Sequence, residues 1–201
     1  MMKEFWNERY STEAYVYGRE PNTFFREQLL QLKPGKILLP GEGEGRNAVF
    51  AASLGWEVHA FDVSDAGQIK AHRLAGEAGV TIQYTLASYL EFDNQGVQYD
   101  AIGLFFTHQP AEMRREFHAR LLTMLAPGGT LIMEKFHKEQ VHRNTGGPGN
   151  VDFLVDEAEV REDFGSLEVA LLNQLVRPLD EGSFHQGEAV VLQFVGKKKN
   201  N

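Results

Sequence analysis

The chain has 201 residues, of which 42% are hydrophobic, and this size favours one compact domain with a full-sized core. Its formal net charge is −8, and its basic run at residues 197–199 is too short for the many phosphate contacts that nucleic-acid binding requires. Because the sequence contains no cysteine, disulfides, thiolate metal sites and a cysteine nucleophile are excluded.

The sequence gives no sign of export or of membrane insertion. Its start, MMKEFWNERY, mixes acidic with aromatic residues and lacks the apolar core of a secretory signal. No apolar run approaches the ~20 residues that span a bilayer. We therefore expect a soluble, cytoplasmic protein without a membrane or nucleic-acid partner.

Aromatic residues are concentrated before the first predicted helix, which Asn22 is expected to cap. They are Trp6, Tyr10, Tyr15 and Tyr17. Two readings of this segment stay open. It is either a strap packed on the core or a lid over a ligand, where ring faces would attract a cation by about 0.5–2 kcal/mol.

Residues 37–48 read ILLPGEGEGRNA, a short apolar run followed by glycines at every second position and then by residues that can start a helix. Apolar residues repeat at helical spacing until Gly55, so the pattern predicts a strand, a glycine-rich turn and a helix. Such a turn lets a ligand approach bare backbone at a helix N-terminus.

Two acidic residues, Glu42 and Glu44, lie within this turn. At ~5 Å and an effective dielectric constant of ~20, each carboxylate would oppose a bound pyrophosphate by about 3 kcal/mol. A cationic ligand would meet no such barrier, so the turn favours a cation over a dinucleotide.

From residue 57 to residue 136 the sequence pattern alternates between strands and helices. Strands are predicted at 57–63, 81–87, 99–106 and 130–136, and helices at 64–78, capped by Ser64, and at 110–125. This alternation predicts a parallel sheet with helices on both sides.

The last third departs from that rhythm. Residues 137–155 are predicted to form a long loop, and a helix follows at 156–164. Two strand-like runs, 167–176 and 189–195, are joined by a connection that favours an antiparallel pair.

Ligands of open α/β sheets bind outside the carboxyl ends of the strands. Asp62, which ends the second strand 17 residues after Gly45, is placed to accept hydrogen bonds from a ribose diol. The residues after the third and fourth strands meet the same edge: Ala87, Ser88, Thr107 and His108.

These residues resemble the class I S-adenosylmethionine-dependent methyltransferases over nearly the whole chain. The glycines match that family's GxGxG loop, Asp62 matches its ribose acid, and LLTMLAPGGTLIMEKF matches its segment around strand five. Five further stretches resemble the small bacterial methyltransferases related to the tellurite-resistance and thiopurine methyltransferases: WNERY, YVYGREPNTFF, THQP, the GGP at 146–148 after the fifth strand, and EGSFHQGEAVV.

The resemblance implies a Rossmann-like three-layer αβα sandwich with a mostly parallel seven-stranded sheet and a C-terminal antiparallel hairpin. It implies a single methyltransferase domain over 1–201, with an N-terminal lid and helix at 1–35, a cofactor-binding core at 36–136, and a substrate-side loop and hairpin at 137–201. The implied cofactor is S-adenosyl-L-methionine, bound by Gly41, Glu42, Gly43, Gly45, Asp62, Val63, Ala87, Ser88, Thr107, Arg9 and Tyr17.

The chain departs from the family pattern in two places. Leu39 stands where the family usually has an acid that contacts the methionine end of the cofactor, and Glu42 is the candidate to take over this contact. Ala87 and Ser88 stand where an aspartate commonly contacts the adenine amino group, and a serine hydroxyl can still accept that hydrogen bond.

Methyl transfer from a sulfonium is a displacement at carbon, so the protein must mainly hold a small-molecule acceptor in line and dry. Soft acceptors such as thiolates or chalcogen oxyanions offer a lone pair directly, whereas alcohols and amines need a proton removed. His108 is the candidate to orient or deprotonate the acceptor, with a hydrogen bond to loop backbone as the competing reading. The remaining histidines lack metal-ligand spacing, so no metal site is expected.

Two other function classes remain open from the sequence. A nicotinamide-dependent oxidoreductase shares the strand, turn and acid, but Arg46 stands where its third glycine is required. A binding module that keeps the cofactor fold without catalysis is the second alternative.

Overall fold

The computed structural model describes residues 2–200. Its elements in chain order are α1 (Met2–Arg9), α2 (Thr23–Leu29), β1 (Lys36–Pro40), α3 (Arg46–Ser53), β2 (Glu57–Asp62), α4 (Asp65–Glu77), β3 (Gln83–Leu86), β4 (Tyr99–Phe105), α5 (Ala111–Met124), β5 (Leu125–Phe136), η1 (Lys138–His142), η2 (Val151–Phe153), α6 (Glu157–Asp163), β6 (Glu168–Asp180) and β7 (Gln186–Lys197).

A single seven-stranded sheet has the order β3-β2-β1-β4-β5-β7-β6. The first five strands run parallel to one another, and β7 pairs antiparallel with both β5 and β6. The predicted Rossmann-like architecture with a C-terminal antiparallel hairpin is therefore confirmed. The hairpin is tighter than the sequence indicated, because β6 continues to Asp180, which pairs with Gln186.

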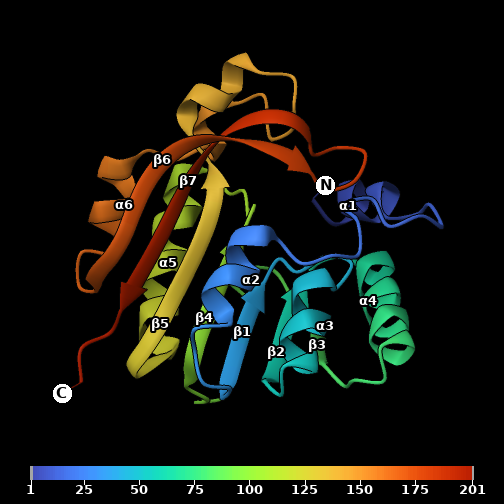
Figure 1. Cartoon of the computed structure of the whole chain (residues 1–201), viewed down its shortest axis with the longest axis horizontal. Coiled ribbons are helices and arrows are strands. Elements are labelled where there is room, and N and C mark those ends of the chain that lie inside the picture. The colour runs from blue at the N-terminus through green and yellow to red at the C-terminus, as the bar shows by residue number, and fades with distance from the viewer. Residues whose placement is uncertain (1, 201) are drawn as a thin grey trace.

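Alternate side chains of each central strand enter different cores, which explains the continuous apolar runs. In β1, Ile37 and Leu39 pack with α2 and α3, whereas Leu38 packs with α5 on the opposite face. Figure 1 shows α2 and α3 in front of the sheet and α5 behind it. The sheet is thus covered on both faces.

Strand order reverses between β1 and β4, which are neighbours in the sheet. The chain moves outward from β1 through β2 to β3, and then returns to the other side of β1. The turn after β1 and the segment after β4 therefore meet at the switch point, where open α/β sheets bind ligands.

Helix caps follow the sequence closely. The side chain of Asn22 accepts a hydrogen bond from the Phe25 N–H, and that of Ser64 accepts one from the Gly67 N–H. Both predicted caps are confirmed. The APGG segment at 126–129, which separates the predicted helix at 110–125 from the predicted strand at 130–136, lies at an irregularity inside β5, which already pairs at Leu125.

Two segments contain structure that the sequence pattern did not indicate. Helix α1 has no buried residue, so it lacks the apolar stripe that would predict it. The long loop at 137–155 includes the two short 3-10 helices η1 and η2. Among the described residues, no helix is both long and apolar enough to cross a membrane.

Candidate active site

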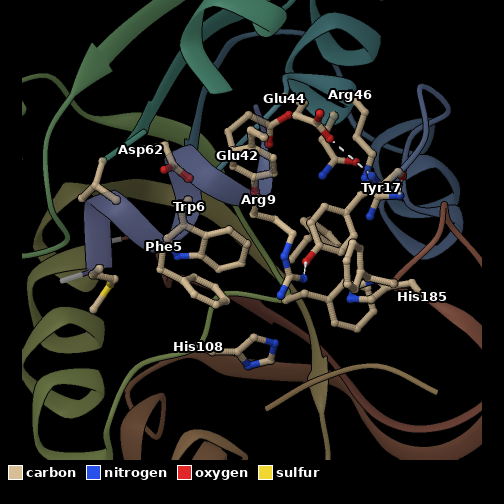
Figure 2. A pocket seen from close by; sticks show the side chains of 18 of the residues that line it. Phe5, Trp6, Arg9, Tyr17, Glu42, Glu44, Arg46, Asp62, His108 and His185 are labelled. Atoms are coloured by element: carbon tan, nitrogen blue, oxygen red, sulfur yellow. Dashed lines mark hydrogen bonds between the residues drawn. The ribbon is translucent and has the colours of Figure 1, made fainter. Parts of the chain in front are cut away.

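A cavity of about 380 Å³ lies at the switch point. Its walls come from α1 and the segment after it, the glycine turn, the ends of β2 and β4, the long loop and the β6–β7 turn. In the view of Figure 2, Glu42 and Asp62 lie at one end of this pocket and His108 at the other, with Arg9 between them. The volume falls within the range of small-molecule sites.

The glycine turn is held against β2 by its own backbone. The N–H groups of Gly41 and Glu42 both donate to the Phe61 carbonyl, at 2.8 and 3.2 Å. Gly41 has φ +63°, and a Cβ there would come within 2.5 Å of the Tyr89 hydroxyl. The left-handed φ favours glycine here, and Gly41 lines the cavity, where a ligand can approach its backbone.

Asp62 is fixed by two backbone hydrogen bonds. One oxygen accepts from the Gly43 N–H at 3.1 Å and the other from the Ser64 N–H at 3.0 Å. The side chain lines the cavity although the residue is only 8% exposed. Burial raises the pKa of the Asp62 carboxyl, whereas the two hydrogen bonds act to lower it. A carboxylate offers about four lone-pair sites, so acceptor capacity remains for a ribose diol.

Glu42 also lines the cavity and is anchored at the start of α3. Its carboxylate accepts a hydrogen bond from the Ala48 N–H at 2.7 Å. Burial raises the pKa of Glu42 to about 7, with the Ala48 hydrogen bond and the Arg46 charge acting in the opposite direction. A cation at this end of the cavity would favour the ionised form.

Glu44 does not act as the free charge that the sequence predicted. Its carboxylate forms an ion pair with Lys70 and accepts hydrogen bonds from the N–H groups of Val16, at 2.8 Å, and Tyr17, at 3.3 Å. Glu44 therefore ties the N-terminal segment to the glycine turn. The acidic character facing a ligand comes from Glu42 and Asp62.

The segment that follows α1 is held at several further points. Lys70 donates to the carbonyls of Thr12 and Ala14, at 2.9 and 2.6 Å, and Arg46 donates to the Tyr17 carbonyl at 3.0 Å. Tyr10 is buried in the core. The sequence left two alternatives open for the N-terminal segment, a strap or a lid. The stretch after α1 is packed on the core as a strap.

Helix α1 forms a cover that is attached mainly through polar contacts. Asn7 accepts hydrogen bonds from the Ser64 hydroxyl at 2.7 Å and from the Ala66 N–H at 3.3 Å, which places α1 on the N-terminus of α4. Trp6 stacks on Tyr10 at a centroid distance of 5.4 Å and lines the cavity. The helix has the position of a lid.

The opposite end of the cavity contains His108, as the sequence predicted for a residue after β4. Its ring stacks on Phe136 at a centroid distance of 5.6 Å, and its buried Nδ1 has no hydrogen-bond partner among residues 2–200. Burial, assisted by the nearby Lys135 charge, lowers the pKa of His108 to about 3 against a hydrogen bond to the Phe153 backbone, which is the loop contact of the competing reading. His108 is therefore neutral at physiological pH.

His185, from the β6–β7 turn, lies close to the same end. Its ring contacts Tyr17 and Phe106 at centroid distances of 4.7 and 4.6 Å. Its Nδ1 lies 3.6 Å from the Glu181 carboxylate, and burial lowers its pKa against the effect of that carboxylate. The far end is thus built from aromatic rings and two imidazoles.

Some predicted cofactor residues line the cavity and others support it. The lining includes Gly41, Glu42, Asp62, Val63, Ala87, Arg9 and Tyr17. Outside the lining, Ser88 donates to Glu91 at 2.6 Å, Thr107 is buried, and Gly45 has φ +91° and packs closely on Ala71. Gly43 donates to Asp62, so it supports the site from behind.

Sequence reasoning missed several lining residues that come from distant segments: Phe5, Tyr89, Phe106, Gly146, Gly147, Pro148, Phe153 and Phe184. The GGP motif in the long loop and the phenylalanine beside His185 were the available signals. Among the described residues, no group of three or more histidine or acidic side chains is arranged to hold a metal ion.

A Rossmann-like fold with a reversed terminal hairpin, a glycine turn and a strand-end acid defines a class I methyltransferase architecture. Residues 37–129 match the protein family described as Methyltransferase domain. None of the curated protein sequences matches this chain significantly.

Solved structures share the fold over nearly the whole chain. TehB from Haemophilus influenzae has a TM-score of 0.73 at 16% identity and covers 98% of this chain and 67% of its own. NodS from Bradyrhizobium japonicum WM9, an N-methyltransferase in complex with S-adenosyl-L-homocysteine, has a TM-score of 0.73 at 16% identity and covers 98% of each chain. A structure from a study of thioacetal formation during echinomycin biosynthesis reaches 0.79 at 14% identity and covers 100% of this chain and 93% of its own.

Identities of 14–16% show that these proteins share the fold, and the family match shows that residues 37–129 form a methyltransferase domain. The chain therefore contains a methyltransferase domain over residues 37–129, within a fold that it shares with S-adenosylmethionine-dependent methyltransferases of known structure. TehB is among the proteins with the same fold, in agreement with the resemblance to the tellurite-resistance group.

Proposed function

We propose that this methyltransferase acts on a small-molecule acceptor that already offers a lone pair, such as a thiol or a chalcogen oxyanion. The observation that supports the proposal is the pairing of two ends in one cavity, acidic at Glu42 and Asp62 and neutral at His108. The N-terminal part would cover the site, the core at 36–136 would hold the cofactor, and the remainder would shape the acceptor end.

The residues present fit the cofactor at the acidic end. Asp62 would accept hydrogen bonds from the ribose diol, and the bare backbone at Gly41 would lie against the nucleoside. Glu42 would face the cationic methionine portion, in place of the acid that Leu39 replaces. Val63, Ala87 and Tyr17 would complete the walls, while Gly43, Gly45, Ser88 and Thr107 would hold them in position.

When bound, the cofactor supplies a methyl group on a sulfonium, which any suitably placed nucleophile can displace. The chain has to align that nucleophile and exclude water. Trp6 and Tyr17 line the cavity with ring faces, which attract a cation and remain dry.

His108 would orient the acceptor through its Nδ1, which has no protein partner among residues 2–200. A group whose pKa is about 3 is a weak base, so the site suits nucleophiles that need no proton removed. This property favours thiols and oxyanions over alcohols.

The test is release of S-adenosylhomocysteine with a panel of thiol, amine, phenol, tellurite and selenite acceptors. We expect turnover with a thiol or a chalcogen oxyanion and none with phenols. Turnover with phenols or amines alone would contradict the acceptor class, and binding of the cofactor without turnover of any acceptor would favour a binding module.

A further inference from the structure

Arg9 is a cation that faces the cavity without an anionic partner. Its guanidinium donates one hydrogen bond to the Tyr17 hydroxyl at 3.1 Å, and it forms no ion pair with any of residues 2–200. Arg46 also lines the cavity, but it is paired with Glu181 at 2.8 Å. Arg19, the other arginine of this segment, is paired with Glu77 outside the cavity.

The Arg9 side chain is held between aromatic rings. The guanidinium carbon lies 3.8 Å from the ring centroid of Phe184 and 5.0 Å from that of Phe5. These contacts fix the plane of the guanidinium, and a fixed fork of N–H donors is suited to a carboxylate or another oxyanion. In a chain with net charge −8, such a cation is a local exception to the overall potential.

Arg9 also stands between two cavities. A second cavity of about 520 Å³ is lined by residues of α1, including Glu8, by the segment after α1 and by the β6–β7 turn, and Phe5, Arg9 and Phe184 line both cavities. Phe5 and Phe184 are 50% and 47% exposed, so the partition between the cavities consists of side chains that are open to solvent on one side. An acceptor that enters through the outer cavity would meet Arg9 first.

Arg9 lies between the two ends of the cavity, and a chain of contacts links it to His108 at the acceptor end. Tyr17, its hydrogen-bond partner, contacts His185, whose ring contacts Phe106 and Phe136, and Phe136 stacks on His108. The acids expected to hold the cofactor lie at the other end (Figure 2). This arrangement differs from the expectation, drawn from the sequence, that Arg9 binds the cofactor.

We propose that Arg9 is a specificity-determining residue that binds a carboxylate or similar oxyanion on the methyl acceptor. The inference rests on the proposed function and narrows it to acceptors that carry an anionic group. The nucleophile of such an acceptor would extend toward His108, and its charged group would remain at the partition between the cavities.

The test is calorimetry on protein saturated with S-adenosylhomocysteine, titrated with benzoate and with its uncharged analogue benzamide. The wild type should bind benzoate about tenfold more tightly than benzamide. Arg9→Gln should abolish this preference and Arg9→Lys should retain part of it. Arg19→Gln, in the same segment, should leave it unchanged, and thermal unfolding should confirm that all variants fold.

Affinity for S-adenosylhomocysteine and for 5′-methylthioadenosine, which lacks the amino acid group, is measured in the same variants. Unchanged affinities for both in Arg9→Gln support the proposal. A loss of affinity confined to S-adenosylhomocysteine would assign Arg9 to the cofactor carboxylate and overturn the proposal. Equal binding of benzoate and benzamide by the wild type would also overturn the proposal. Failure of the wild type to bind S-adenosylhomocysteine would instead overturn the proposed function.

Discussion

The two ends of the cavity are built in different ways. The acidic end comes from the turn after β1 and the last residue of β2, which are adjacent strands of one parallel sheet. The far end combines α1, the segment after β4, the long loop and the β6–β7 turn, which are distant in sequence. The first arrangement is fixed by the fold, whereas the second can vary with loop sequence while the fold is kept.

The ends also differ in electrostatics. Burial raises the pKa of Glu42 to about 7 and raises that of Asp62, so bringing a cation to this end relieves a cost of the folded state. At the far end burial lowers the pKa of His108 to about 3 and also lowers that of His185, and Arg9 provides a positive charge. A cationic cofactor and an anionic acceptor would each meet a complementary end.

The largest effect is expected from Asp62→Ala. Removing the carboxylate leaves the ribose hydroxyls without their charged acceptor, which should weaken cofactor binding by about 1–3 kcal/mol. Calorimetry with S-adenosylhomocysteine measures the loss, and Asp62→Asn, which keeps the shape, separates charge from packing.

Asp93→Ala, in an exposed loop, serves as the control and should bind the ligand normally. An unchanged dissociation constant for Asp62→Ala, with intact thermal unfolding, would place Asp62 outside the cofactor site.

A smaller effect is expected from pH, through Glu42. Its pKa is raised from 4.5 to about 7, so the folded protein holds a proton that the unfolded chain has lost between these values, and stability should fall as pH rises across this window. Binding of the cationic cofactor should therefore strengthen toward pH 7, by at most about tenfold per pH unit, and level off above it.

Glu42→Gln should remove this pH dependence. It should also weaken the binding of S-adenosylmethionine more than the binding of adenosine, which lacks the amino acid group. Glu116→Gln, on the exposed face of α5, is the matched control. Equal losses for the two ligands would mean that the substitution only disturbs the glycine turn.

The smallest effect concerns the cover. The structure divides the N-terminal segment, because the Val16 and Tyr17 N–H groups are bonded to Glu44 while α1 has no buried residue. The amides of Val16 and Tyr17 should be protected from hydrogen exchange without ligand. The amides of α1 should exchange rapidly without ligand and more slowly when the cofactor is bound. Identical exchange of α1 with and without ligand would show that it is no lid.

The sequence predicted the fold well because each central strand and helix has a local signature. The apolar runs, the Ser64 and Asn22 caps and the glycine turn each correspond to one feature of the structure. Asp62 and Glu42 were predictable for the same reason, since strand ends meet at one edge of a parallel sheet.

Contacts between distant segments were not predictable in this way. Glu44 was expected to face the ligand, but Lys70, 26 residues away, neutralises it. Ser88 satisfies its hydroxyl with Glu91, and the rings around His185 come from elements that no local pattern links. Such pairings depend on tertiary packing, which periodicity does not report.

The most direct test of the account is a calorimetric comparison of S-adenosylmethionine, S-adenosylhomocysteine and NAD. The acidic end formed by Glu42 and Asp62 predicts micromolar binding of the first two and no measurable binding of NAD, whose pyrophosphate these carboxylates oppose. Binding of NAD more tightly than S-adenosylmethionine would contradict the account.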